Sequence, residues 1–161
     1  MNFKYTALYI VLIVAVNYCF SVVPLVPVLG EMFPPMSLIV GFIFVARDFS
    51  QREIGHKVII AMLFAAALSY VMADPVVAVA SLAAFLFSEM ADWAVYSFTG
   101  KPFHQRILLS SLLATPIDSV IFLELIGHFS LLGALLMTLS KMLGALIVWY
   151  MVRGRDTAKA V

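Results

Sequence analysis

Residues 75–98 read PVVAVASLAAFLFSEMADWAVYSF, and this stretch decides the fold. As a helix rising 1.5 Å per residue, it is long enough to cross the roughly 30 Å hydrocarbon core of a bilayer. It nevertheless contains Glu89 and Asp92. A charged residue at the centre of a membrane helix costs roughly 2.5 to 3.5 kcal/mol, so such residues usually pair or line a polar pathway. The stretch therefore indicates a membrane helix in a bundle with a polar interior.

The composition of the whole chain agrees with this interpretation. Of its 161 residues, 64% are hydrophobic and only 12% are charged, which is too apolar for a soluble domain. The formal charge of +1 gives no reason to expect a nucleic acid partner. Cys19 is the single cysteine, which excludes an intrachain disulfide. We predict an all-α membrane protein with one domain, residues 1–161. Its first apolar stretch lacks the cleavage pattern of a signal peptide, so we expect it to remain in the protein as a membrane span.

Apolar stretches separated by short connections predict a bundle of six membrane-spanning helices. A spanning helix needs about 20 residues, so the second and third stretches are short and must be tilted or extended by flanking polar residues. Several prolines lie in and beside the first connection, as is typical of a turn. The predicted helices cover residues 5–29, 32–46, 58–73, 75–98, 107–126 and 129–152.

The basic residues orient this bundle. With six spans, every Lys and Arg outside the predicted helices falls on one side of the membrane, so the positive-inside rule places both termini in the cytoplasm. The first three and last three helices would then have opposite orientations, as two inverted halves do, although the halves share no convincing sequence match. These basic residues are Lys4, Arg47, Arg52, Lys57, Lys101, Arg106, Arg153, Arg155 and Lys159, and the opposite loops carry Glu31, Asp74, Glu124 and His128.

Four polar side chains from different helices fall close to the bilayer midplane. From the midpoints of the stretches, Asn17, Glu89, Asp118 and Lys141 lie within about 4 Å of the centre, and Asp92 lies about 8 Å toward the cytoplasm. Secondary transporters bind their substrates at this depth between helices. We therefore predict a substrate site here. Lys141 is interpreted either as a counter-ion of Asp118 or Glu89, or as a direct ligand contact.

Acidic and aromatic residues share one stripe of the helix predicted at 75–98, because Phe85, Glu89, Asp92, Trp93 and Tyr96 recur at intervals of three and four residues. This combination suits a flat heterocycle, since rings stack on its faces and a carboxylate accepts hydrogen bonds from adjacent N–H groups. The stripe extends the predicted substrate site to Phe85, Trp93 and Tyr96. For Trp93 and Tyr96, an alternative is the aromatic belt at the membrane interface.

A proline interrupts the helix predicted at 107–126. Pro116 cannot donate a hydrogen bond to the carbonyl of Leu112, so a backbone acceptor is free beside Asp118. This carbonyl must find a partner or line a cavity. We therefore include Thr115 with Asp118 in the predicted site. The alternative is a simple kink, in which the hydroxyl of Ser111 or Thr115 satisfies the carbonyl.

Residues 47–57 contain several charges around Gly55. Their spacing fits a short amphipathic helical turn with internal ion pairs, and a solvated loop that fixes the topology is equally compatible. Asp48 and Arg52, four residues apart, could also form a cytoplasmic gate.

In the last predicted helix, Ser140 and Gly144 are four residues apart, which predicts close packing against a neighbouring helix.

Several of these features together resemble the queuosine precursor transporter family, also called the YhhQ or vitamin uptake transporter family. The resemblance covers nearly the whole chain and rests on short motifs in the same order: Asn17-Tyr18, the pattern Asp48-x-x-x-Arg52-x-x-Gly55, Asp92, Asp118-Ser119 and Lys141.

Membership would imply a multi-pass importer in the inner membrane of a bacterium, with 7-cyano-7-deazaguanine or 7-aminomethyl-7-deazaguanine as substrate for tRNA modification. Glu89 stands where some members carry an uncharged amide. The additional carboxylate would favour the cationic aminomethyl compound or mark proton coupling.

The runner-up function is a substrate-binding subunit of an energy-coupling transporter for a vitamin or another small heterocycle. Such a subunit needs an ATPase partner and typically shows an Ala-x-x-x-Ala face on its first helix, which Ala7 and Ala15 do not form. An enzyme is not expected, because the sequence has no intramembrane protease signature, no His-rich metal motif and no phosphate-binding glycine loop. We therefore expect no catalytic residues, no metal and no cofactor. A homo-oligomer is left open.

Overall fold

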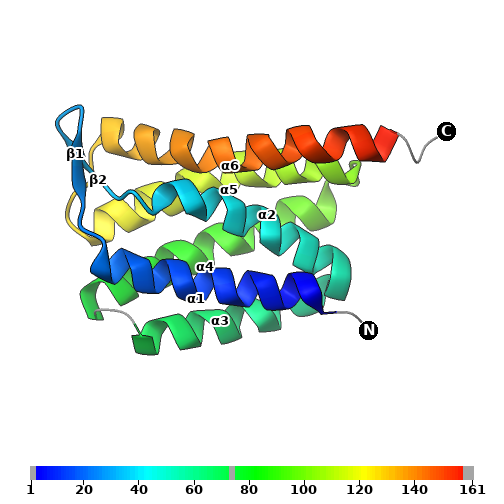
Figure 1. The fold of residues 1–161 in the computed structure, drawn as a ribbon, viewed down its shortest axis with the longest axis horizontal. Coiled ribbons are helices and arrows are strands. Elements are labelled where there is room, and N and C mark those ends of the chain that lie inside the picture. The colour runs from blue at the N-terminus through cyan, green and yellow to red at the C-terminus, as the bar shows by residue number, and fades with distance from the viewer. Residues whose placement is uncertain (1–2, 73–74, 158–161) are drawn as a thin grey trace.

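The computed structural model is a bundle of antiparallel helices with a small hairpin at one end (Figure 1). It describes residues 3–72 and 75–157, with side chains for all of these except 72–78 and 154–157. Residue 73 of the third predicted span, as well as Asp74 and Lys159, lie outside the described residues, and the side chain of Arg155 is not described. The elements are α1 (Lys4–Val22), β1 (Val26–Val28), β2 (Glu31–Phe33), α2 (Ser37–Ile54), the short 3-10 helix η1 (Gly55–Lys57), α3 (Val58–Met72), α4 (Pro75–Phe98), α5 (Phe103–Leu125) and α6 (Leu131–Thr157).

The bundle buries ionisable side chains and exposes large apolar ones. Arg47, Asp48, Glu89, Asp92 and Lys141 are at most 1% exposed. The outward faces carry leucine, isoleucine, valine and phenylalanine, for example Val11, Ile60, Phe64, Phe87, Leu139 and Leu143. This distribution is the one expected for helices surrounded by lipid, because charged groups inside a membrane face the bundle interior.

Five stretches of the described residues are long and apolar enough to cross a membrane, as expected of an all-α membrane protein. They are α1, the continuous stretch Ser37–Val71, and most or all of α4, α5 and α6. The continuous stretch contains α2, η1 and α3, which follow one another without a loop.

The first two predicted helices have different bounds in the structure. Residues 5–29 were predicted as one helix, but α1 ends at Val22. Residues 26–33 instead form an antiparallel hairpin in which Val26 pairs with Phe33. Pro24 and Pro27 explain this difference, because proline has no N–H to continue a helix, and the neighbouring valines favour extended backbone.

The prediction that the second helix covers residues 32–46 was also wrong. Helix α2 runs from Ser37 to Ile54, so most of the charged segment 47–57 belongs to it. No proline or glycine interrupts the chain between Phe42 and Ile54, and the helix ends where Gly55 adopts a positive φ of 63°. The last two helices, α5 and α6, begin and end within a few residues of their predicted bounds, whereas α4 matches its prediction.

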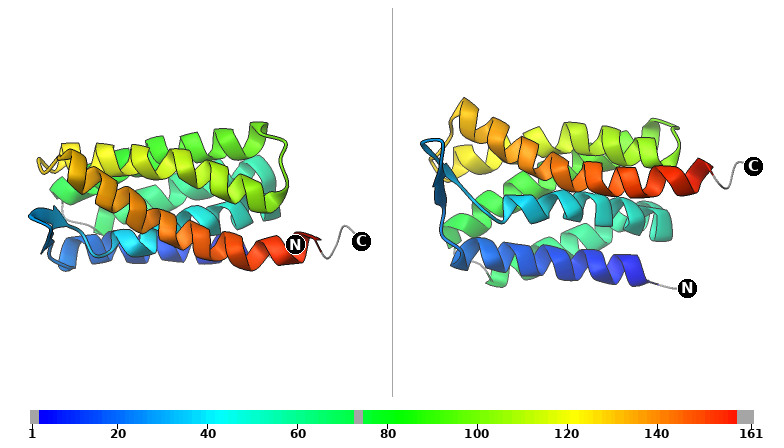
Figure 2. Two further views of the ribbon diagram at one scale, coloured as in Figure 1. Left: turned by 90° about the horizontal axis from the view of Figure 1, so that it is seen from above. Right: turned by 45° about the horizontal axis from the view of Figure 1, so that its top comes forward.

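Helix α1 begins and α6 ends at the same end of the bundle (Figures 1 and 2). The turn between α2 and α3 and the connection between α4 and α5 also lie there, whereas the hairpin lies at the opposite end. We refer to these as the terminal end and the hairpin end. Six basic residues lie at or near the terminal end, as their positions in the helices and connections show: Lys4, Arg52, Lys57, Lys101, Arg106 and Arg153.

The two halves of the chain pack differently. Among the described residues, α1 contacts both α2 and α3, whereas α4 contacts α5 but makes no close contact with α6. Helix α6 packs instead against α5 and α2. The hypothesis of two inverted halves therefore remains a prediction from topology.

Helices α2 and α6 cross at very close range. A Cβ atom added to Gly41 would overlap the backbone carbonyl oxygen of Lys141, and one added to Gly144 would lie 3.0 Å from the backbone of Gly41. Next to this crossing, the hydroxyls of Ser37 and Ser140 share a hydrogen bond of 2.9 Å. The predicted packing role of Ser140 and Gly144 is thus confirmed, because small residues let two membrane helices approach closely.

Candidate functional site

Lys141 and Asp118 form an ion pair inside the bundle. The ammonium Nζ of Lys141 lies 2.5 Å from Oδ2 of Asp118, and Lys141 is fully buried. Oγ of Ser119 lies 3.1 Å from the same ammonium, and the hydroxyl of Ser88 donates to the other carboxylate oxygen at 3.2 Å. Of the interpretations left open by the sequence, the structure therefore selects Asp118 as the counter-ion of Lys141.

This pair lines a cavity between five helices, which we call the central cavity. Its volume is about 40 Å³. A water molecule needs roughly 10 to 15 Å³ on this measure, so the cavity holds only a few waters. Five residues of the predicted substrate site lie in its wall, namely Asn17, Phe85, Glu89, Asp118 and Lys141, and the other lining residues include Phe20, Phe44, Ser81 and Phe122.

Two buried polar atoms in the cavity wall have no hydrogen-bond partner within the protein. They are Oε1 of Glu89 and the hydroxyl oxygen of Ser81. Asn17, by contrast, donates from Nδ2 to the hydroxyl of Ser69 at 3.1 Å and so also joins α1 to α3. Buried polar groups are nearly always paired, so the two unpaired atoms mark where a bound molecule or water supplies the missing partners.

A second buried group of ionisable residues adjoins the cavity through Glu89. It comprises Tyr9 of α1, Arg47 and Asp48 of α2, and Glu89 and Asp92 of α4, and we call it the arginine cluster. Each of these residues is at most 1% exposed.

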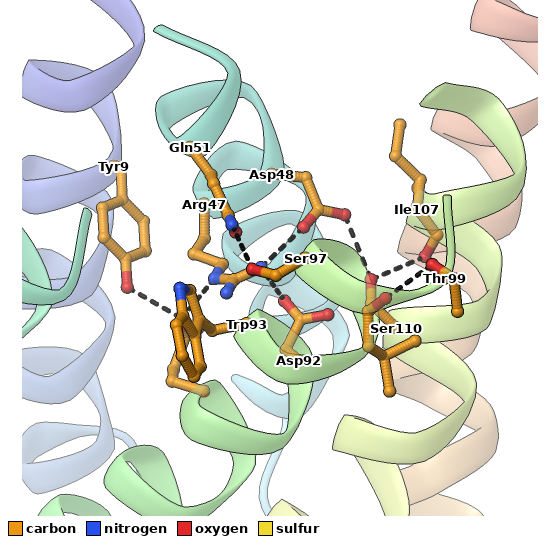
Figure 3. Close-up of polar contacts among 12 residues, drawn as sticks. Tyr9, Arg47, Asp48, Gln51, Asp92, Trp93, Ser97, Thr99, Ile107 and Ser110 are labelled. Atoms are coloured by element: carbon orange, nitrogen blue, oxygen red, sulfur yellow. Dashed lines mark hydrogen bonds and ion pairs between the residues drawn. The ribbon is translucent and has the colours of Figure 1, made fainter. Parts of the chain in front are cut away.

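Arg47 contacts all three carboxylates of this cluster. Its Nη1 lies 2.8 Å from Asp48 and 3.1 Å from Asp92, and its Nε lies 3.3 Å from Glu89. The hydroxyl of Tyr9 donates to Glu89 at 2.9 Å. Figure 3 shows Arg47 directed between Asp48 and Asp92, with Tyr9 approaching from α1. At such distances the Coulomb attraction between a guanidinium and an ionised carboxylate is several kcal/mol at an effective dielectric of about 20, before the cost of removing both charges from water, and Arg47 links α2 to α4.

A larger hollow opens at the hairpin end, and we call it the vestibule. Its volume is about 440 Å³, and it is lined by the last residues of α1, the chain that follows them, and the end of α5. Phe20 and Phe122 line both the vestibule and the central cavity. Their ring centroids are 5.2 Å apart, so these two side chains separate the two spaces.

The other predicted site residues lie outside the lining of the central cavity. Asp92 belongs to the arginine cluster. The indole N–H of Trp93 donates to Nδ1 of His56 at 3.2 Å. Tyr96 is only 6% exposed, and its ring packs near the guanidinium of Arg106, 5.2 Å from the centroid. Tyr96 is thus buried within the protein and does not lie in a lipid-facing aromatic belt.

Thr115 is fully buried, but its hydroxyl has no hydrogen-bond partner, and neither has that of Ser111. The alternative in which one of these hydroxyls satisfies the carbonyl freed by Pro116 is therefore wrong for this structure. The backbone carbonyl of Thr115 accepts a hydrogen bond from Ser119 at 2.7 Å, which positions Ser119 beside Lys141.

The two residues of the suggested gate have separate surroundings. Asp48 is fully buried, where it pairs with Arg47 and accepts a hydrogen bond from Ser110 at 3.2 Å. Arg52 is exposed, and its guanidinium lies 4.7 Å from the ring centroid of Phe103. A gate made of an ion pair between Asp48 and Arg52 is therefore not the arrangement found here, because Asp48 points into the bundle.

Sequence reasoning missed Arg47 as a site residue. The positive-inside rule assigned it to a loop, together with the other basic residues. The signal that could have found it is the uninterrupted run from Phe42 to Ile54, which predicts a helix that carries Arg47 and Asp48 inward. Tyr9, Ser81, Phe20, Phe44 and Phe122 gave no signal, because such residues are common throughout apolar helices.

Comparisons with protein-family models, characterised proteins and solved structures give no match to this chain.

Within residues 3–72 and 75–157, no three His, Cys, Asp or Glu side chains are placed to hold a metal ion.

Proposed function

We propose that this protein is a carrier that moves a flat, nitrogen-rich heterocycle across the inner membrane of a bacterium. The proposed substrate is a queuosine precursor, 7-cyano-7-deazaguanine or 7-aminomethyl-7-deazaguanine, which feeds tRNA modification. In this proposal α1 to α6 each cross the membrane and the terminal end faces the cytoplasm, since most basic side chains gather there.

One observation carries the proposal: Oε1 of Glu89 is buried without a partner in the wall of a cavity that is also lined by phenylalanines. A guanine-like base offers adjacent N–H donors on one edge and two flat faces. The carboxylate of Glu89 accepts from that edge, while the rings of Phe85 and Phe44 contact the faces. The hydroxyl of Ser81 provides a further hydrogen bond.

The size of the cavity implies that substrate binds after a rearrangement. Pockets that enclose drug-sized ligands have volumes of about 300 to 1,000 Å³, far above the 40 Å³ found here. The structure thus corresponds to a closed conformation of the carrier. In the proposed import route, substrate collects in the vestibule and reaches the central cavity when Phe20 and Phe122 move apart.

A complementation experiment tests this function. A bacterium unable to make the deazaguanine precursor is given the chain, is fed either compound, and is scored for modified tRNA. We expect rescue by the unchanged chain and by Glu124→Gln, which alters an exposed carboxylate. We expect none with Glu89→Gln or Asp118→Asn at equal membrane abundance.

Failure of the unchanged chain despite correct insertion would remove deazaguanines as substrates. Uptake by purified protein alone in lipid vesicles separates a carrier from a subunit of an energy-coupling transporter, because the latter needs its ATPase.

A further inference from the structure

The arginine cluster contains more acid than its bases can neutralise. Three carboxylates surround one guanidinium, and all are at most 1% exposed. The second buried cation, Lys141, is paired with Asp118. If all these groups were ionised, the cluster would hold two uncompensated negative charges away from water. Such an arrangement is strongly unfavourable, because buried like charges repel and neither is hydrated.

The hydrogen bonds within the cluster lead to the same conclusion. Both oxygens of Asp48 have a donor, Arg47 for one and Ser110 for the other. Glu89 accepts from Tyr9 with Oε2, but its Oε1 has no donor. Both oxygens of Asp92 also lack an aligned donor, although Arg47 is within ion-pair distance of one. An ionised carboxylate requires donors at its oxygens, so the protein does not provide for three ionised carboxylates here.

The surroundings of Glu89 contain no further cation that could change this count. Among the described residues, α1 contributes Tyr9 and α2 contributes Arg47 and Asp48. Helix α5 contributes Asp118, and α6 contributes Lys141 on the far side of the cavity. The only ionisable side chain of α3 is the exposed Tyr70.

We propose that the arginine cluster is a proton-binding site that couples proton movement to the transport of the molecule in the central cavity. This inference rests on the proposed carrier function and assigns its driving ion. Glu89 belongs to both: its Oε2 accepts from Tyr9 in the cluster, its buried Oε1 has no partner, and the residue lines the cavity. A proton passed from Glu89 to the neighbouring Asp92 stays within the cluster and leaves the carboxylate of Glu89 free to accept from the N–H edge of a substrate.

Polar groups continue from the cluster toward the terminal end. Asp48 is bonded to Ser110, and one turn further along α2 the amide of Gln51 donates to Ser97 at 2.9 Å (Figure 3). When substrate binds, the proton on Glu89 passes to Asp92, and the freed carboxylate of Glu89 accepts from the substrate. The proton then leaves through Asp92 and Asp48 toward the cytoplasm, as the substrate does, and Glu89 takes up the next proton from the opposite side of the membrane.

Infrared spectroscopy tests the proton site without any substrate. The full-length protein is studied in an ester-free detergent, where the carbonyl stretch of a protonated carboxyl is resolved and shifts in heavy water. At neutral pH we expect such a band in the unchanged protein and in Glu124→Gln. We expect it to disappear in at least one of Glu89→Gln, Asp92→Asn and Asp48→Asn. Absence of the band, or its loss only in Asp118→Asn, overturns the proposal.

Vesicle uptake tests the coupling. Labelled 7-aminomethyl-7-deazaguanine is supplied outside, with or without an outside-acid pH gradient. We expect the gradient to raise initial uptake several-fold in the unchanged protein, and expect this ratio to fall to about one in Asp92→Asn and Asp48→Asn. Equal uptake with and without the gradient, or stimulation by sodium instead, overturns proton coupling. If the infrared band of a protonated carboxyl in the arginine cluster is found but no uptake is measured, the proposed substrate is wrong and the proton site still stands.

Discussion

Replacement of Lys141 by methionine tests the ion pair in the central cavity. The change keeps the length of the side chain but removes the ammonium that lies 2.5 Å from Asp118. The side chain of Asp118 is only 13% exposed, so its carboxylate would remain largely buried without a counter-ion. Removal of one partner from a buried pair typically costs about 3 to 5 kcal/mol. At about 1.4 kcal/mol per factor of ten, the unfolding equilibrium shifts roughly a hundredfold to a few thousandfold.

The second half of this test is the double variant Lys141→Met with Asp118→Asn. It removes the orphaned charge, so we expect most of the lost stability to return, and we expect the loss in the double variant to be far smaller than the sum of the losses in the two single variants. Stability is measured by unfolding the purified protein in mixed micelles, followed by tryptophan fluorescence. The control is Lys101→Met at an exposed position, for which we expect a change within about 0.5 kcal/mol. A loss below about 1 kcal/mol for Lys141→Met, or no recovery in the double variant, would refute the reasoning.

Three further predictions concern α2 and the vestibule. Arg47→Met leaves the three carboxylates of its cluster without a cation, and we expect a loss of about 3 to 5 kcal/mol in the same unfolding assay, against little change for the exposed Arg52→Met. Gly41→Ala forces a methyl group against the backbone of α6, and we expect a loss of about 1 to 3 kcal/mol; unchanged stability would mean that the helices cross less closely. In a Cys19→Ser background, a cysteine at Ala84 in the cavity wall should react slowly with a bulky thiol reagent, and Phe20→Ala should accelerate labelling at least several-fold; equal rates would contradict a barrier formed by Phe20 and Phe122.

Much of the central cavity was predictable because charges in apolar stretches are restricted to few places. Glu89, Asp118 and Lys141 had to face the interior, and their depth along each helix placed them in one layer with Asn17. The same reasoning left Asp118 and Glu89 as alternative counter-ions of Lys141, and the packing of Gly144 followed from the spacing of small residues. Helix α4 had clear limits in the sequence, with Pro75 at its start and Gly100 just beyond its end.

The remainder depended on information that a single sequence does not display. Arg47 looked like a topology signal, since the rule that orients membrane helices counts basic residues without regard to burial. Residues 26–29 and 32–33 were mistaken for helix ends because a short apolar run is compatible with both a helix and a strand. Trp93 and Tyr96 share a helical face with Glu89, but Trp93 lies beside His56 of η1 and Tyr96 lies beside Arg106 of α5, and these positions depend on tertiary packing.

The close crossing at Gly41 has a mechanical consequence. It ties the backbone of α2 to that of α6 at Lys141 itself, so the two cations of the interior, Arg47 and Lys141, are carried by one joined pair of helices. Glu89, Asp92 and Asp118, which they contact, are on α4 and α5. Any movement that parts α2 and α6 from α4 and α5 would pull both cations from these carboxylates at once. Water would have to hydrate the parted charges, so we expect the open conformation to be a wet one that forms only briefly.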